Sequence, residues 1–179
     1  LHSAKMKEHF NITPKIFRNT ELIYSDEIGA MVGKLGYKGI LTEGAKHVLG
    51  WKSPNFVYAN AINPKVKVLL KNFRMSDDIA FRFSNQGWGD WPLTADKFVD
   101  WIKNMDEQED LLNLFMDYET FGEHQNAETG IFDFLKAFPT QIINNSNIKF
   151  TTPSEAIKQF DVVAPVHVPN TISWADEER

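Results

Sequence analysis

Hydrophobic positions along the chain change repeatedly between a helical and a strand-like spacing. After Ser25, one apolar face repeats at the i, i+3, i+4, i+7 interval of a helix until Gly36. The members of this face are Ile28, Met31, Val32 and Leu35. Thr94 is placed to cap a second helix, in which Phe98, Trp101, Ile102 and Met105 share one face. The spacing therefore predicts two amphipathic helices that pack against a core.

Two further helices are predicted near the end of the chain. The first begins at Thr129 and ends at Pro139, with Ile131, Leu135 and Phe138 on its inner side. The second begins at Thr152, because Pro follows at the first helical position and Glu155 stands three residues after the Thr. Shorter helices are predicted around residues 45–49 and 77–83.

Strand-like segments lie between these helices. They are residues 14–19, 39–42, 66–70, 111–116 and 148–150. The run 111–116 is almost continuously apolar, which is typical of a strand buried on both faces of a parallel sheet. Alternating strands and helices predict an α/β protein with parallel strands, either a barrel or a doubly wound sheet. Without repeats or Gly/Ser linkers, residues 1–179 are expected to form a single domain.

Composition excludes several classes of function. A net charge of −5 and a pI near 5.5 leave no basic stripe for phosphates, so no nucleic acid partner is expected. No apolar run approaches the roughly 20 residues that span a bilayer and no leader pattern is present, so no membrane partner is expected and the cytoplasm is the default location. The chain has no cysteine, which excludes disulfides and thiolate metal sites. Five tryptophans suit a carbohydrate site as well as a large core.

Two carboxylates follow predicted strands. Asp117 comes directly after the run 111–116, and Glu21 comes just after the strand at 14–19. Sites in parallel α/β folds lie at the carboxyl ends of strands, so these acids are candidates to face each other across a pocket, as glycoside hydrolysis requires. Taken singly, each acid is more readily explained as a solvated loop residue or a helix cap than as a catalytic group.

A second interpretation of the Asp117 region is a metal site. Glu119, Glu123 and His124 could join Asp117 as oxygen and nitrogen ligands, but their spacing matches no strong motif such as H-E-x-x-H. The glycines of the loop 85–92 lack the preceding strand and following helix of a phosphate loop. We therefore expect neither a metal nor another cofactor.

Two segments carry a resemblance to a known family. The sequence MDYETFGEH at 116–124 resembles the fourth conserved region of glycoside hydrolase family 57, whose Asp is the general acid/base. The sequence FRNTELIY at 17–24 resembles the third region of its α-amylase-like branch, whose Glu is the nucleophile. Residues 41–47, 76–84, 152–156 and 172–179 also resemble members of that branch. The likeness thus extends along nearly the whole chain.

The resemblance implies part of a distorted seven-stranded (β/α) barrel. The first conserved region, a His-Gln-Pro motif, and the second region have no counterpart in this sequence, and the fifth is expected beyond Arg179. The chain is therefore expected to be an internal fragment of a catalytic barrel that lacks its first strands and its C-terminal helical region. Both catalytic carboxylates are nevertheless present, at Glu21 and Asp117. We expect an active glycosidase in the full-length parent and leave the activity of the fragment open.

The family mechanism implies a role for each residue. Glu21 would attack the anomeric carbon of an α-glucan while Asp117 protonates the leaving oxygen, which requires the carboxyl groups to lie roughly 5 to 5.5 Å apart. Asp117 should then be partly desolvated or close to another carboxylate, with Glu119 and Glu21 as neighbours. Glu119 and three further side chains are expected to bind the sugar, by contacts to hydroxyl groups or by stacking. The three are Arg82, His124 and Trp174.

Three alternatives remain open at the level of sequence. A 4-α-glucanotransferase or branching enzyme would use the same two carboxylates on the same oligosaccharide or polysaccharide. A metal-dependent carbohydrate deacetylase would need clustered histidines, and only His124 lies near the acids in sequence. A non-catalytic glucan-binding segment is the third. The α-amylase-like resemblance favours cleavage of α-1,4-glucosidic bonds.

Overall fold

The computed structural model describes residues 1–176, which fall into two compact units. The sheet unit contains Leu1–Lys71, Asp110–Asn113 and the chain from Thr152 onward, and the helical unit contains Asn72–Glu109 and Leu114–Thr151. The end of the family-like segment 172–179 lies outside the described residues.

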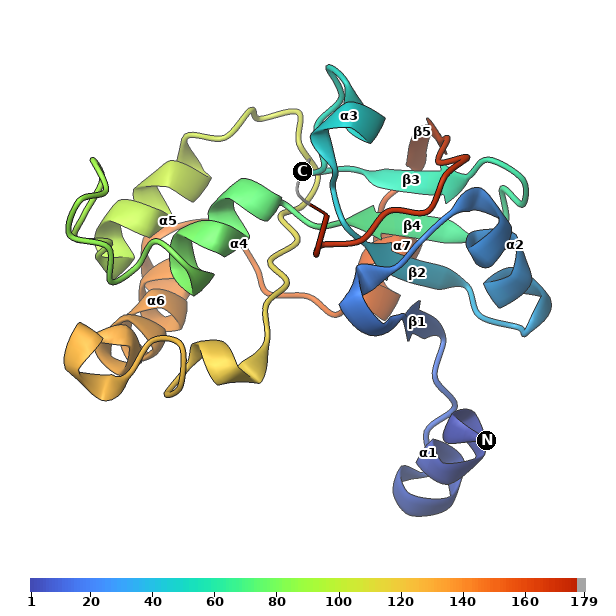
Figure 1. The fold of residues 1–179 in the computed structure, drawn as a ribbon, viewed down its shortest axis with the longest axis horizontal. Coiled ribbons are helices and arrows are strands. Elements are labelled where there is room, and N and C mark those ends of the chain that lie inside the picture. Colours follow the sequence, from blue (N-terminus) through green and yellow to red (C-terminus); the bar gives the residue numbers. More distant parts are fainter. Residues whose placement is uncertain (177–179) are drawn as a thin grey trace. The chain divides into compact units, whose positions relative to one another are not determined.

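The sheet unit is built on five strands in the order β1-β2-β4-β3-β5 (Figure 1). They are β1 (Ile16–Arg18), β2 (Gly39–Thr42), β3 (Val57–Asn60), β4 (Lys67–Leu70) and β5 (Val162–Val166). The pairs β1–β2 and β2–β4 are parallel, as predicted. β3 and β5, which the sequence analysis missed, are parallel to each other, and β3 is antiparallel to β4. The sheet is open in the described residues, with β1 and β5 at its edges.

Four α-helices accompany the sheet. They are α1 (His2–Phe10), α2 (Asp26–Lys34), α3 (Lys46–Leu49) and α7 (Pro153–Gln159). Of the predicted caps, Thr152 is confirmed, because it forms a reciprocal capping box with Glu155, whereas Thr94 makes no side-chain cap hydrogen bond to α5. The Ser25 side chain also caps its helix, by accepting a hydrogen bond from the Ile28 amide. The start points of α2 and α7 are thus set by local side-chain chemistry.

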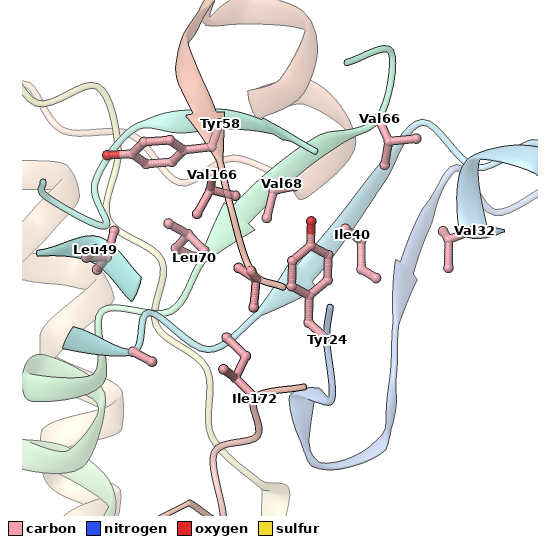
Figure 2. Packing of buried hydrophobic residues seen from close by; sticks show 12 residues of the cluster. Tyr24, Val32, Ile40, Leu49, Tyr58, Val66, Val68, Leu70, Val166 and Ile172 are labelled. Carbon is pink, nitrogen blue, oxygen red and sulfur yellow. The ribbon is translucent and has the colours of Figure 1, made fainter. Parts of the chain in front are cut away.

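Apolar side chains fill both faces of the sheet. On one face, Tyr24, Ile40, Val68 and Leu70 belong to a buried cluster that also takes residues from β3, β5 and α2 (Figure 2). On the other face, Leu69 packs with Val57 and with Ile157 of α7. Successive residues of β4 therefore point to opposite faces, each of them covered. This double burial fixes the strand ends that carry the polar residues described below.

The helical unit packs three helices around phenylalanines. They are α4 (Phe73–Ala80), α5 (Ala95–Lys103) and α6 (Ile131–Asn145). Phe98 of α5 lies 5.8 Å from Phe134 and 5.4 Å from Phe138 of α6, measured between ring centroids. The helix predicted after Thr94 is confirmed, and its inner face is formed by Phe98, Val99 and Ile102.

Two predictions about the region after Asn104 are wrong. The run 111–116 is not a strand, and neither is 148–150. In the first run the Leu111 amide donates to the Asn55 carbonyl at 3.2 Å, and the Phe115 amide donates to Ser76 Oγ at 3.2 Å. The first of these hydrogen bonds lies within the sheet unit and the second within the helical unit, so they do not form a ladder with one neighbouring strand. The six side chains of the run are only half-buried.

Helix α6 also differs from its prediction. It begins after Gly130, which adopts φ +83°, and it continues through Pro139 to Asn145. Proline removes only one amide donor, and the burial of Phe138 and Ile142 on either side of Pro139 favours continuation of the helix. None of the helices in residues 1–176 has the length and apolar character that crossing a bilayer requires.

Candidate active site

Glu21 occupies an unusual backbone conformation just beyond the carboxyl end of β1. It lies in a short 3-10 turn, η1 (Thr20–Leu22), with φ +51° and ψ +19°, and Leu22 also has φ +51°. Two consecutive non-glycine residues in the left-handed region carry strain of the kind that gathers at functional sites, on the order of 1–3 kcal/mol each. Asn19 holds the turn, since its side chain accepts from the Thr20 amide and donates to the Ile23 carbonyl.

Two residues hold the Glu21 turn in place: its neighbour Leu22, and Trp174 from near the end of the chain. The Leu22 side chain is fully buried, which anchors the turn in the sheet unit. The Trp174 indole Nε1 donates to Glu21 Oε2 at 2.6 Å, and the Trp174 amide and Ser173 Oγ both donate to the Glu21 carbonyl oxygen at 3.0 Å. The carboxylate is exposed and is nevertheless held in one orientation. Of the predicted sugar-binding residues, Trp174 is thus placed directly beside Glu21.

Two cations lie near the Trp174 ring. Arg18 Cζ is 4.9 Å and Lys71 Nζ is 5.4 Å from the ring centroid, both within the range of a cation–π interaction. Lys71 Nζ also lies 3.4 Å from Glu43 Oε2, and both side chains are buried. Glu43 Oε1 accepts a hydrogen bond from the Gly44 amide at 2.8 Å.

Sequence reasoning missed Glu43 and Lys71 as site residues. Glu43 directly follows β2 and Lys71 directly follows β4, whereas Glu21 lies beyond the end of β1. Because these three strands are parallel, their carboxyl ends share one edge of the sheet, which brings the charged residues together. The same criterion that selected Glu21 would have selected both residues.

Asp117 lies in the helical unit, at the start of the 3-10 turn η2 (Tyr118–Thr120). The loop after it is closed by backbone bonds, among them the Gln125 amide to the Thr120 carbonyl at 3.0 Å. Gln125 is buried and its side-chain Nε2 donates to the Ala80 carbonyl at the end of α4. A rigid base therefore presents Asp117, whose own side chain is exposed. The expected desolvation of Asp117 is not provided within its unit.

Glu119 and His124 follow Asp117 on the same loop, and both side chains are exposed. The Glu119 carbonyl accepts from the His124 amide at 2.8 Å and from the Glu123 amide at 3.2 Å, so the backbone fixes their spacing. Across the described part of the chain, no group of three or more His, Asp or Glu side chains is arranged to hold a metal ion. The loop is therefore a group of separate polar side chains on a fixed backbone.

Arg82 is bound within the helical unit. Its Nε donates to Asp78 Oδ1 at 2.6 Å, one terminal nitrogen donates to the Arg74 carbonyl, and its guanidinium lies 5.8 Å from the Trp88 ring centroid. Burial raises the pKa of Asp78, and the hydrogen bond and charge of Arg82 act in the opposite direction. Arg82 thus has a structural task in addition to the sugar contact predicted for it.

Glu21 and Asp117 belong to different units, and each is placed within its own. Their expected separation of roughly 5 to 5.5 Å stays a prediction. What the structure contributes is the local setting of each acid: Glu21 clamped by Trp174, and Asp117 at the head of a closed loop.

Comparison with known proteins decides the family. The model of glycosyl hydrolase family 57 matches residues 1–169. The chain belongs to glycosyl hydrolase family 57. The resemblance drawn from the segments at 17–24 and 116–124 is thereby confirmed.

One curated relative and one solved structure in the comparisons illustrate the membership. This family 57 chain is 44% identical over 181 residues to a Methanocaldococcus jannaschii protein named "Putative alpha-amylase", with 100% of the chain and 38% of that protein aligned. The crystal structure of the 4-alpha-glucanotransferase from Thermococcus litoralis aligns with a TM-score of 0.69 at 16% identity, covering 94% of this chain and 26% of that one. The second likeness confirms the predicted α/β fold class. The chain spans well under half the length of either protein.

Proposed function

We propose that the full-length protein containing this chain is a retaining glycoside hydrolase that cleaves α-1,4-glucosidic bonds of α-glucans. Glu21 is the nucleophile and Asp117 the general acid/base. The observation that carries the proposal is Glu21 itself: an exposed carboxylate in a strained turn at the carboxyl end of β1, held by the Trp174 indole. Family membership supports the same assignment. In this proposal both units belong to one catalytic domain.

The first step forms a covalent glycosyl-enzyme. A carboxylate oxygen of Glu21 bonds to the anomeric carbon as the bond from that carbon to the glycosidic oxygen breaks, and Asp117 gives its proton to the departing oxygen. Asp117 must be protonated at this stage, and its exposed position lets the bound sugar itself exclude water from it. The exposed side chains of Glu119 and His124, which follow Asp117 on its loop, are assigned as contacts for sugar hydroxyl groups.

The second step releases the sugar. Asp117, now ionised, takes a proton from a water molecule, whose oxygen bonds to the anomeric carbon while the bond to Glu21 breaks. Two inversions at the same carbon give overall retention. If a second sugar takes the place of water, the product is a transferred glucan, so hydrolysis and transfer differ only in the acceptor.

Hydrolysis is the favoured outcome because the relative at 44% identity carries the name "Putative alpha-amylase". Incubation with maltoheptaose separates the two outcomes, since hydrolysis yields only shorter oligosaccharides and 4-α-glucan transfer also yields longer ones. Branching would appear as new α-1,6 linkages in the proton NMR spectrum. Longer products from the start of the reaction would replace hydrolase by transferase in the proposal.

The proposal is tested in the full-length protein with Glu21→Gln and Asp117→Asn assayed on starch and maltooligosaccharides. Each variant should lose at least about a thousandfold in kcat/KM, because each removes a group that bonds to the reacting atoms. Glu107→Gln and Asp161→Asn make the same chemical changes at exposed carboxylates outside the proposed site and should retain activity. Undiminished activity in either site variant would overturn the role assigned to that residue.

A further inference from the structure

We propose that Trp174 is a positioning residue for Glu21, and that Arg18 and Lys71 polarise its indole for this task. The inference rests on the proposed function, since it assumes that Glu21 is the nucleophile. It also changes the role predicted for Trp174 from a stacking platform for sugar to a hydrogen-bond donor within the protein. Glu43 completes the arrangement by holding Lys71.

The hydrogen bonds distinguish the two oxygens of the Glu21 carboxylate. Oε2 accepts a hydrogen bond from the Trp174 indole N–H, with Nε1 and Oε2 2.6 Å apart, which is short for a bond from a nitrogen donor to a carboxylate. Oε2 is therefore committed to the indole, and Oε1 is assigned as the oxygen that bonds to the anomeric carbon. The two bonds to the Glu21 carbonyl, from Ser173 Oγ and the Trp174 amide, keep the backbone from relaxing out of its left-handed conformation.

The neighbouring cations act on the donor rather than on sugar. Arg18 and Lys71 lie 4.9 Å and 5.4 Å from the centroid of the Trp174 ring, and a cation at this distance draws on the electron density of the ring. The indole N–H is thereby made a stronger donor to Oε2. The ion pair with Glu43, at 3.4 Å and buried, keeps the Lys71 ammonium group in place.

The hydrogen bond from Trp174 to Glu21 favours the second step of the reaction, the breakdown of the glycosyl-enzyme. In the glycosyl-enzyme, Glu21 is an ester and carries no charge, so its bond to Trp174 is weak. Negative charge returns to Glu21 when that ester breaks, and a preorganised N–H then stabilises the departing carboxylate. Loss of the indole hydrogen-bond donor should accordingly slow breakdown of the glycosyl-enzyme.

The test is Trp174→Phe in the full-length protein, with α-maltosyl fluoride as substrate. Fluoride leaves readily, so the second step limits turnover. The variant's kcat should fall about 10- to 100-fold, the effect expected from losing one hydrogen bond to a charged group. KM should stay the same or fall, because the covalent intermediate accumulates. Trp174→His, which retains a ring N–H, should recover part of kcat. Trp51→Phe makes the same change at a 92% exposed tryptophan and should behave as wild type.

Two kinetic results for Trp174→Phe would overturn the inference. A raised KM with unchanged kcat would overturn the inference in favour of sugar stacking, and wild-type kinetics would overturn it outright. If Trp174→Phe does not fold, benzothienylalanine at position 174 replaces the indole N–H by sulfur at nearly the same size and gives the same comparison. Glu21→Ala with added azide separates this inference from the proposed function. Formation of a β-maltosyl azide there supports Glu21 as nucleophile whatever Trp174→Phe does.

Discussion

Lys71 and Glu43 form a buried ion pair at the carboxyl ends of β4 and β2, with Nζ and Oε2 3.4 Å apart. Replacing only Lys71 leaves a buried carboxylate without its ammonium neighbour, which typically costs about 3–5 kcal/mol. Lys71→Met should therefore lower the free energy of unfolding by about this amount in urea titrations, and the double variant Lys71→Met/Glu43→Gln should regain much of it.

An ion pair on the surface serves as the control for the Lys71→Met variant. Lys5 and Glu8 form an ion pair on α1 with both side chains more than half exposed. Lys5→Met should change the free energy of unfolding by less than about 1 kcal/mol, because solvent screens the pair. Equal losses in the free energy of unfolding for Lys5→Met and Lys71→Met would contradict a stabilising role of the buried pair.

Gly44 packs directly against the backbone that carries Lys71. A Cβ added at Gly44 would lie 2.1 Å from the Lys71 carbonyl oxygen, so the β2 and β4 ends would have to separate. Gly44→Ala should destabilise the protein by about 2 kcal/mol or more, measured as a lower urea midpoint. Gly89→Ala is the control, because a Cβ there meets nothing within 4 Å. A loss of equal size at Gly89 would count against the close approach.

Tyr24 makes the stability of the sheet unit sensitive to high pH. Burial raises the pKa of Tyr24 to about 12 from 10.0, although the hydrogen bond from Asn60 lowers it somewhat. The folded state thus favours the neutral phenol. The stabilisation, roughly 2–3 kcal/mol, is fully present below pH 10 and is lost as the pH rises toward 12.

Urea midpoints measured between pH 9 and pH 12 test this dependence. Tyr24→Phe should start less stable, because Asn60 Nδ2 loses its bond to the Tyr24 hydroxyl, and should decline less steeply with pH. Tyr118→Phe, at a 96% exposed tyrosine, should keep the wild-type slope. The same slope in Tyr24→Phe as in wild type would exclude Tyr24 as the cause.

Arg82 stabilises the helical unit through Asp78. Without Arg82, the buried Asp78 carboxylate loses a 2.6 Å charge-assisted bond, and burial raises the pKa of Asp78 further. A raised folded pKa favours the protonated acid, so the loss in Arg82→Met should be largest near pH 7 and smaller near pH 4. Arg82→Met/Asp78→Asn should remove that pH dependence. A pH-independent loss in Arg82→Met would contradict this role.

The parts of the fold predicted from sequence are those with local signals. Ser25 and Thr152 start helices by their own side chains, and the parallel strands β1, β2 and β4 are marked by short apolar runs. β5 was not predicted, and it contains Pro165, a residue type that is disfavoured within strands. It is tolerated because β5 is an edge strand, where one side of the backbone needs no partner. The run 111–116 was mistaken for a strand because apolar composition does not reveal whether a neighbouring strand exists.

In the candidate site, too, features with a local sequence signal were predicted and contacts between distant residues were not. Glu21 and Asp117 follow from family segments and from their positions after apolar runs, which are visible in sequence. The contact of Glu21 with Trp174 and that of Glu43 with Lys71 join residues far apart in the chain, so no local spacing encodes them. The left-handed conformation of Glu21 is equally invisible in sequence, because glutamate carries no preference for it.

The most direct test of the account is to trap the covalent intermediate on the full-length protein. A 5-fluoro-α-glucosyl fluoride slows breakdown of the glycosyl-enzyme more than its formation, and mass spectrometry of the digested protein then locates the sugar. We expect a single labelled peptide with the added mass on Glu21. A label on Asp117 or another residue, or a product of inverted anomeric configuration by NMR, would contradict the assignment of Glu21 as the nucleophile.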